Sequence, residues 1–86
     1  MIKEEINRKS EVLHALGHPI RFAIVKGLLK NGCHVNKIVN ALGIPQSSVS
    51  QHLGVLKAAR IIAGERNGVS ICYKVIDEYA RKIIQI

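Results

Sequence analysis

The sequence is poor in aromatic residues, cysteine and proline. Its 86 residues include no Trp, one Phe, two Tyr, two Cys and two Pro. No apolar run approaches the ~18 residues that a membrane-spanning helix needs. Two cysteines are too few for a disulfide scaffold, and the mixed charges at the N-terminus predict no secretory signal, so we expect a reducing, cytoplasmic location. The scarcity of aromatic residues argues against a protein that binds RNA or single-stranded DNA by stacking the bases on aromatic side chains.

Carboxylates are missing from the whole middle of the chain. Between Val12 and Gly64 there is no Asp or Glu, while six Lys and Arg residues accumulate, and the formal net charge of the chain is +7. A basic stretch of this length attracts polyanions, and double-stranded DNA is the polyanion that fits best. The alternative is a basic surface that only keeps the protein in solution.

Apolar residues, by contrast, are abundant. Hydrophobic residues make up 48% of the chain, and 21 of the 86 are Ile or Val. A domain of this size buries only about 60% of its unfolded surface. We therefore expect one domain over residues 1–86 and a partner subunit that covers the remaining apolar surface.

Hydrophobic periodicity predicts a mainly α-helical chain. Turn signals at Gly17-His18-Pro19, Asn31-Gly32 and Gly43-Ile44-Pro45 divide it into expected helices over 4–16, 19–30, 36–42 and 46–59, with a short extended bridge over 33–35. The expected buried positions of the third and fourth helices are Val35, Ile38, Val39, Leu42, Val49, Leu53 and Leu56.

After residue 60 the pattern changes to that of β-strands. Asn67-Gly68 separates two runs rich in β-branched residues, and this dipeptide is a strong hairpin signal because both turn residues take positive φ. The second run alternates apolar and polar residues from Val69 to Val75, the period of a half-buried strand. A last helix is expected from about Asp77. A hairpin directly after a helix-turn-helix predicts a winged helix, with the helix-turn-helix over about 35–59 and the wing over about 61–75.

The fourth helix carries the functional prediction. With its apolar edge toward the core, its opposite side shows Ser47, Gln51 and Gly54, flanked by Ser48 and Ser50. Gln can bond an adenine edge, Ser can bond bases or phosphates, and a helix N-terminus favours phosphate. These residues predict a helix that reads the major groove of DNA. The alternative is a solvated helix that happens to carry Ser and Gln.

Two segments resemble the ArsR/SmtB family of small winged-helix repressors. They are Leu-Gly-His-Pro-Ile-Arg-Phe-Ala-Ile-Val at 16–25 and Ala-Leu-Gly-Ile-Pro-Gln-Ser-Ser-Val-Ser-Gln-His-Leu at 41–53. The wing strand and Asp77 extend the resemblance over essentially the whole chain. It implies a homodimeric transcriptional repressor that binds an imperfect palindrome near a promoter and uses its first and last helices as the interface. Pro45 departs from the family, which usually has a capping Ser there.

The residues and the resemblance together give two sets of candidates. The expected contacts with DNA are Gln46, Ser47, Ser48, Ser50, Gln51, His52, Lys57 and Arg66. The expected dimer-interface residues are apolar side chains that are too many to stay exposed on a monomer: Ile6, Val12, Leu13, Tyr79, Ile83 and Ile84.

No standard sensor site of the family is complete in this sequence. The positions of the paired cysteines in arsenic- and cadmium-type sensors carry His34 and Asn36, with Cys33 one place out of register. At the zinc-type site Asp77 is present, Tyr79 stands where His is needed, and the sequence ends before the second pair of ligands. We therefore expect no metal and no cofactor.

The sequence leaves two roles open for the cysteines. In this architecture Cys33 and Cys72 are expected in neighbouring strands, either as small apolar fillers or as a thiol switch. A metal-responsive repressor with a non-standard site and an architectural DNA-binding protein without sequence preference are the other functions considered. An enzyme is not expected, because no nucleophile, base and orienting group converge at a recognisable spacing.

Overall fold

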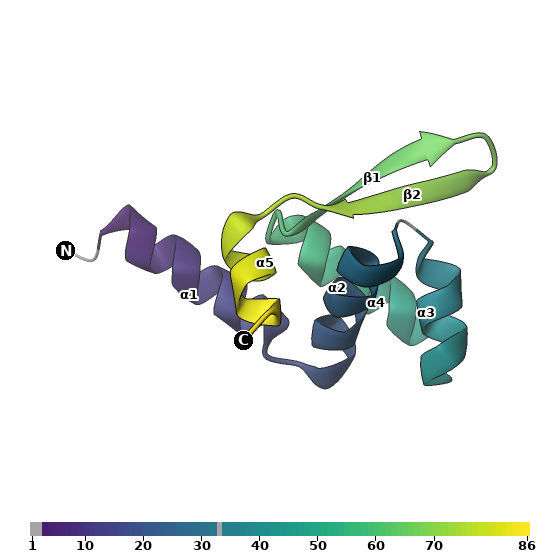
Figure 1. The fold of residues 1–86 in the computed structure, drawn as a ribbon, viewed down its shortest axis with the longest axis horizontal. Helices are drawn as coiled ribbons and strands as arrows, with labels where there is room; N and C mark the ends of the chain where they lie inside the picture. Colours follow the sequence, from purple (N-terminus) through teal and green to yellow (C-terminus); the bar gives the residue numbers. More distant parts are fainter. Residues whose placement is uncertain (1–2, 33) are drawn as a thin grey trace.

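The chain forms five helices and one β-hairpin in a computed structural model that describes residues 3–32 and 34–86. The elements are α1 (Glu4–Leu16), α2 (Pro19–Asn31), α3 (Val35–Leu42), α4 (Gln46–Ala58), β1 (Ile62–Asn67), β2 (Ser70–Val75) and α5 (Glu78–Ile84). Helix α1 and the hairpin leave the helical body in opposite directions (Figure 1), and the molecule measures 44 × 25 × 23 Å. The predicted winged helix-turn-helix is confirmed.

The element boundaries agree with the predicted ones to within one residue, and particular side chains explain them. Pro19 is the first residue of α2, and the Nδ1 atom of His18 accepts the N–H of Ile20 at 3.1 Å, which caps that helix. The carboxylate of Asp77 accepts the N–H of Ala80 at 2.9 Å and caps α5 in the same way.

The chain bends by 100° between α1 and α2. The break falls at Gly17 and His18, so His14 lies in the last turn of α1 whereas His18 is the N-cap of α2. Within the described residues, no single helix is long and apolar enough to cross a membrane; α1 and α2 meet that test only when the bent pair is taken together.

In the bridge before α3, His34 has the extended backbone that the sequence analysis expected, with φ of −94° and ψ of 99°, and the bridge ends one residue earlier than predicted. Val35 is the first residue of α3 and His34 is its N-cap, while Cys33 lies outside the described residues. In the part of the chain that the structure describes, the only sheet is the antiparallel pair β1–β2. Val35 begins the buried stripe that continues with Ile38 and Val39, as predicted, and the expected pairing of a strand at Cys33 with the second wing strand stays a prediction.

One hydrophobic cluster joins the five helices to the base of the hairpin. Helix α4 contributes Val49, Leu53 and Leu56, which confirms the predicted buried edge. Leu42 was expected in the stripe of α3, but it is the last residue of that helix and is 46% exposed. The most deeply buried large side chains are those of Val12, Ile24, Val25, Val49, Leu56, Ile61 and Ile62.

Two side chains expected at a dimer interface lie inside the protomer instead. Val12 is fully buried and Ile84 nearly so, because α5 packs beside α1 and closes over its inner face. The expectation that these two side chains are exposed is therefore wrong. Ile6 and Leu13, seven residues apart on another face of α1, are each 54% exposed. Tyr79 on α5 is half-buried, as is its neighbour Ile83.

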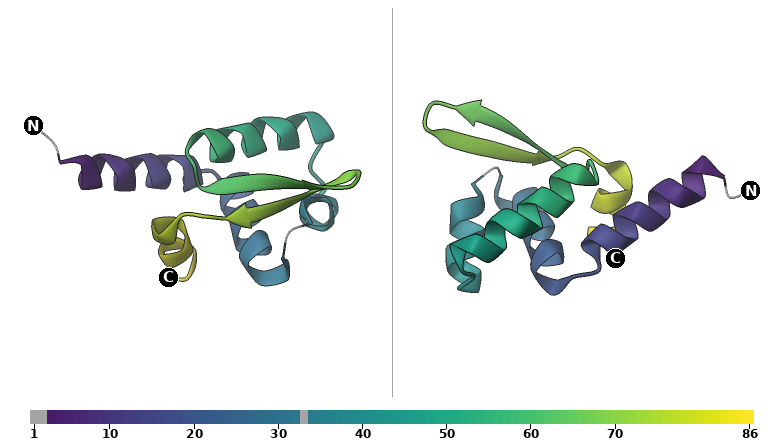
Figure 2. Two further views of the ribbon diagram at one scale, coloured as in Figure 1. Left: turned by 90° about the horizontal axis from the view of Figure 1, so that it is seen from above. Right: turned by 180° about the vertical axis from the view of Figure 1, so that it is seen from behind.

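The hairpin is buried only at its base. Ile62 and Val75 form the first pair of the ladder and are buried, whereas Ile71 is 42% exposed and Val69, at the turn, is fully exposed. Figure 2 shows that the tip of the hairpin reaches beyond the end of α4, away from the base that packs on the helical body. The half-buried strand predicted from alternation is confirmed only near the base, where Tyr73 is half-buried and Val75 is buried.

Candidate nucleic-acid interface

Helix α4 presents a polar face without carboxylates to solvent. Figure 2 shows this helix lying across one side of the molecule with its outer face uncovered. Gly54 has no heavy atom within 4 Å of the place where a Cβ would lie, so another backbone can approach closely there. Ser48 is half-buried at the edge of this face. The exposed residues of α4 expected to contact DNA are Gln46, Ser47, Ser50, Gln51 and Lys57.

The N-terminal end of α4 is open. The carbonyl of Pro45 accepts the N–H groups of Ser48 and Val49 at 3.0 and 3.1 Å. The N–H groups of Gln46 and Ser47 come before them and have no acceptor within the helix, and Pro45 supplies no side-chain cap. Such N–H groups, at the positive end of the helix dipole, bind phosphate oxygens.

The hairpin supplies a second exposed polar element beside α4. Residues 63–71 are all exposed, and they include Arg66 next to the turn. The Lys74 ammonium lies 3.9 Å from the Glu65 carboxylate on the neighbouring strand, an exposed pair of little energetic weight. Lys57 of α4 places its Nζ 5.9 Å from the ring centroid of Tyr73 on β2, a cation–π contact that links helix and hairpin.

A polar hollow of 270 Å³ separates the hairpin from the N-terminal ends of α3 and α4. His34 and Asn36, which stand where arsenic-type sensors carry cysteines, line it together with Gln46, Ser70 and Tyr73. In the described ranges 3–32 and 34–86, no three His, Cys, Asp or Glu side chains come together as a metal site requires.

Of the two cysteines, Cys72 lies within the described residues. Cys72 is half-buried on β2, where it pairs in register with Glu65 of β1. Cys33 lies outside the described residues. The proposed closeness of the two thiols, and the thiol switch that depends on it, stay predictions.

His52 lies on the inner side of α4, against the start of α2. Its ring centroid is 4.5 Å from that of His18, and its Nδ1 is 3.4 Å from a guanidinium nitrogen of Arg21, which also donates to the carbonyl of Ala15. Burial lowers the pKa of His52, and the neighbouring His18 and Arg21 lower it further. The fold therefore favours a neutral imidazole at this contact between α2 and α4.

We expect the protein to lose stability as the pH falls below about 6.5. In the unfolded chain His52 takes up a proton near its ordinary pKa of 6.5, whereas the pKa in the folded protein is lower. The unfolded state then binds more protons, so the stabilisation from neutral His52 is complete above pH 6.5 and declines toward the folded pKa. Urea unfolding between about pH 7.5 and about pH 5.5 measures this slope.

His52→Gln should flatten the slope, because it removes the titrating group. His14→Gln changes an exposed histidine of α1 and serves as the control. If His52→Gln leaves the pH dependence unchanged, burial of His52 is not its source.

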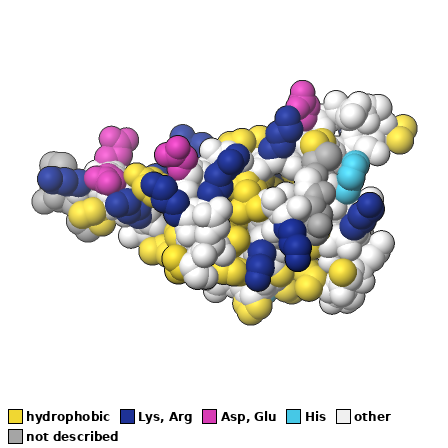
Figure 3. Space-filling view, in the orientation of Figure 1, with side chains coloured by type: hydrophobic (Ala, Val, Ile, Leu, Met, Phe, Trp, Pro, Cys, Tyr) yellow, Lys and Arg dark blue, Asp and Glu magenta, His cyan; other side chains and the backbone are white. Residues whose placement is uncertain are grey.

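Charge is distributed unevenly over the surface. The acidic side chains visible in Figure 3 lie toward the α1 end and on the hairpin, whereas the region over α2 and α3 shows Lys, Arg and His side chains and no Asp or Glu. The sequence has no Asp or Glu from residue 12 to residue 64, so α2, α3 and α4 carry none. The helix-turn-helix therefore has a positive charge that no local carboxylate offsets.

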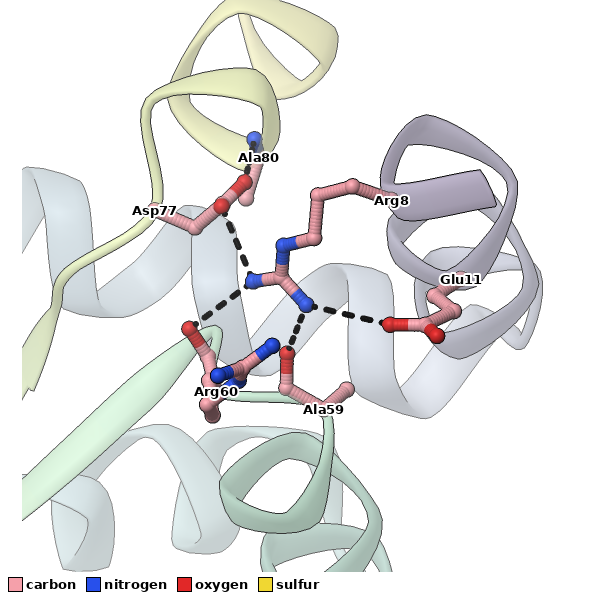
Figure 4. A network of polar contacts seen from close by, with 6 residues as sticks. All are labelled: Arg8, Glu11, Ala59, Arg60, Asp77 and Ala80. Carbon is pink, nitrogen blue, oxygen red and sulfur yellow. Dashed lines mark hydrogen bonds and ion pairs between the residues drawn. The ribbon is translucent and has the colours of Figure 1, made fainter. Parts of the chain in front are cut away.

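Arg8 is a residue that the sequence analysis missed. Its guanidinium donates to the carbonyls of Ala59 and Arg60 at the end of α4 and to the carboxylate of Asp77 (Figure 4). A signal was present in the sequence, because Arg8 precedes the buried Val12 by four residues and so lies near the inner face of α1. A basic residue at such a position indicates acceptors on a neighbouring element.

Known proteins similar to this chain cover almost its full length. The family described as "bacterial regulatory protein, arsR family" matches residues 18–63. The HTH-type transcriptional repressor SmtB of Mycobacterium tuberculosis is 40% identical over 82 residues, which are 95% of this chain but 61% of SmtB. An uncharacterised HTH-type transcriptional regulator of Methanocaldococcus jannaschii is 34% identical over 84 residues, 96% of this chain and 94% of that protein.

Solved structures share the fold. The crystal structure of the transcriptional repressor PagR of Bacillus anthracis superimposes with a TM-score of 0.84 and 32% sequence identity, over 94% of this chain and 93% of PagR. The chain thus matches most of PagR, whereas it spans less than two thirds of SmtB.

Proposed function

Because the chain belongs to the arsR family of bacterial regulatory proteins, we propose that it is a transcriptional repressor that binds double-stranded DNA in a sequence-specific way. The observation that carries the proposal is the exposed face of α4, which offers Gln46, Ser47, Ser50 and Gln51 beside an exposed hairpin. The similarity to SmtB and PagR, which are named as transcriptional repressors, supports the proposal. Relatives of this kind are regulators, and we infer that this protein likewise has no enzymatic activity.

In the proposed complex α4 lies in the major groove. The amide of Gln51 reaches an adenine edge, and Ser47 and Ser50 reach bases or phosphates. The open N-terminal end of α4 binds a phosphate through its N–H groups. Arg66 and the tip of the hairpin contact the flanking backbone, which adds affinity without sequence preference.

We infer that the protein binds as a homodimer to an imperfect palindrome. The exposed Ile6 and Leu13 on α1 support this, because a second copy would cover them. A two-fold dimer presents its two α4 helices to half-sites about 34 Å apart, one turn of the duplex. Such a repressor acts in the cytoplasm, where it meets its promoter.

Selection of bound duplexes from a random pool tests this function, with the upstream region of the gene as competitor. A sequence-specific repressor enriches one palindromic motif and binds it about 10³-fold or more tightly than random DNA. An architectural protein binds every duplex alike and enriches none, and that result would refute the proposal.

Substitutions on α4 and on the hairpin should separate specificity from affinity. Gln51→Ala should lose about 1–3 kcal/mol on the selected duplex and relax the preference at one base pair, because it removes a base-edge contact. Arg66→Ala should weaken binding to all duplexes alike and reduce the salt dependence, because it removes a phosphate contact. Fluorescence anisotropy at several salt concentrations measures both effects. Identical behaviour of the two variants would contradict the assignment of sequence reading to α4.

A further inference from the structure

The C-terminal end of α4 closes in a turn that usually needs glycine. The N–H of Ile61 donates to the carbonyl of Leu56 at 3.0 Å, and the N–H of Arg60 donates to that of Lys57 at 2.9 Å. This pair of hydrogen bonds ends a helix when the residue after its cap is left-handed, and that residue is most often Gly. Here it is Arg60, with φ of 57°, a conformation that other L residues avoid.

Arg8 of α1 binds the carbonyls that this turn leaves open. One guanidinium nitrogen donates to the carbonyl of Ala59 at 2.6 Å, and the other donates to that of Arg60 at 3.2 Å. The last carbonyls of a helix carry the negative end of its dipole, which favours a cation. Figure 4 shows the guanidinium between the end of α4, the start of α5 and its own helix.

Asp77 completes the contact from α5. One of its oxygens lies 3.0 Å from the Arg8 guanidinium, and the other accepts the N–H of Ala80 at 2.9 Å. The side chain of Arg8 is 20% exposed and that of Asp77 is 10% exposed, so solvent screens the pair only in part. We call Arg8, Asp77 and the carbonyls of Ala59 and Arg60 the Arg8 joint.

We propose that Arg8 is a positioning residue for DNA recognition, which fixes the orientation of α4 relative to α1 through the Arg8 joint. This inference rests on the proposed DNA binding and dimerisation. The joint holds the C-terminal end of α4, roughly 20 Å from Gln46 at the other end, so Arg8 acts through the helix. Charge-assisted hydrogen bonds from a planar guanidinium suit this role, because they fix direction as well as distance.

The orientation of α4 relative to α1 affects binding most when the DNA site is a palindrome. Both α4 helices of a dimer have to meet their half-sites at once, and α1 is the helix that carries the proposed interface. A change in the angle between α1 and α4 therefore alters the spacing at which the two reading helices are presented. Binding to random DNA depends on charge and does not require that spacing.

The test compares Arg8→Met, which removes the guanidinium, with Arg8→Lys, which keeps the charge without the planar fork. Lys9→Met is the matched control, because Lys9 is the next residue of α1, is exposed, and pairs with Glu5 of the same helix at 3.1 Å. Its Nζ also lies 5.3 Å from the ring centroid of Tyr79 on α5, so this variant removes a charge and a contact with α5 but leaves the Arg8 joint intact. The probes are a 40-bp duplex (about four helical turns) that the wild type selects from a random pool, a scrambled duplex of equal length, and the selected duplex with one base pair inserted at its centre. Binding is measured by fluorescence anisotropy, under conditions in which circular dichroism shows that each variant is folded.

We expect Arg8→Met to weaken binding to the selected duplex about 3- to 30-fold, the range for residues that modulate binding without contacting the ligand. Binding to the scrambled duplex should stay within about twofold, because the contacts with phosphates remain. The loss caused by the central insertion should shrink, since a looser α4 tolerates altered spacing. Arg8→Lys should show the same changes to a smaller extent, and Lys9→Met should show none of them.

Selective changes of this kind support the proposal, because a merely structural residue would lower stability without altering the preference between duplexes. If Arg8→Met keeps the wild-type preference and the wild-type penalty for the insertion, the proposal is wrong. If Arg8→Met does not fold, Arg8→Lys decides, and a wild-type preference in that variant overturns the proposal. If the wild type itself prefers no duplex, the proposed function fails and the inference about Arg8 fails with it.

Discussion

Leu56→Ala is expected to lower the free energy of unfolding by about 2–5 kcal/mol, the range for removing a buried leucine side chain. Leu56 has no exposed surface and lies in the core on the inner face of α4. A chain of 86 residues has a total stability of roughly 4–13 kcal/mol. The variant should therefore unfold at a much lower urea concentration, and the fraction of protein able to bind DNA should fall with it.

Val55→Ala is the matched control. Val55 precedes Leu56 in the same helix but is 39% exposed, so its truncation should change stability by only about 0.5 kcal/mol. Urea unfolding followed by circular dichroism measures both variants. Equal effects of the two substitutions would mean that α4 does not bury the face assigned to it.

Leu13→Asp is expected to turn the proposed dimer into a monomer. Leu13 is 54% exposed on α1, and a two-fold interface would bury it once in each protomer. Full burial of a leucine side chain contributes about 1.5–3 kcal/mol, and a dimer can cover only the exposed half of Leu13, so two copies contribute about 1.5–3 kcal/mol in total. The dissociation constant should therefore rise by about 10- to 10²-fold or more, since the substitution also places a carboxylate in the interface. Sedimentation equilibrium at micromolar concentration measures this shift.

Leu42→Asp is the control for charge and lost hydrophobicity. Leu42 is 46% exposed at the end of α3, away from α1 and α5, so its substitution should leave the oligomeric state unchanged. A folded wild-type monomer at micromolar concentration would refute the dimer. Dissociation by both variants alike would refute the placement of the interface on α1.

The sequence predicted the elements well because their ends depend on residues with one local role. Pro19 starts α2, Asn67-Gly68 forms the hairpin turn and Asp77 caps α5, and each of these effects involves only neighbouring residues. The buried edge of α4 was predictable for a similar reason, since helical periodicity alone shows which positions share a face.

Contacts between distant segments could not be predicted in this way. Periodicity indicates that Val12 lies on an apolar face of α1, but not whether α5 or a second protomer covers that face. The contact of His52 with His18, and that of Arg8 with Asp77, likewise join segments far apart in the chain. Such contacts follow from how the helices pack together, which a single sequence does not specify.

The shallow anchorage of the hairpin affects how its tip takes part in binding. Beyond Ile62 and Val75, Tyr73 still packs against the core and contacts Lys57 of α4, whereas residues 63–71 are exposed, and an isolated two-stranded ribbon is marginally stable in water. Its outer hydrogen bonds therefore open and re-form at little free energy while the core stays intact. A duplex that contacts Arg66 selects one arrangement from this fluctuating set. The loss of conformational entropy on binding then offsets part of the electrostatic attraction, while the buried base keeps the ribbon pointing in one direction.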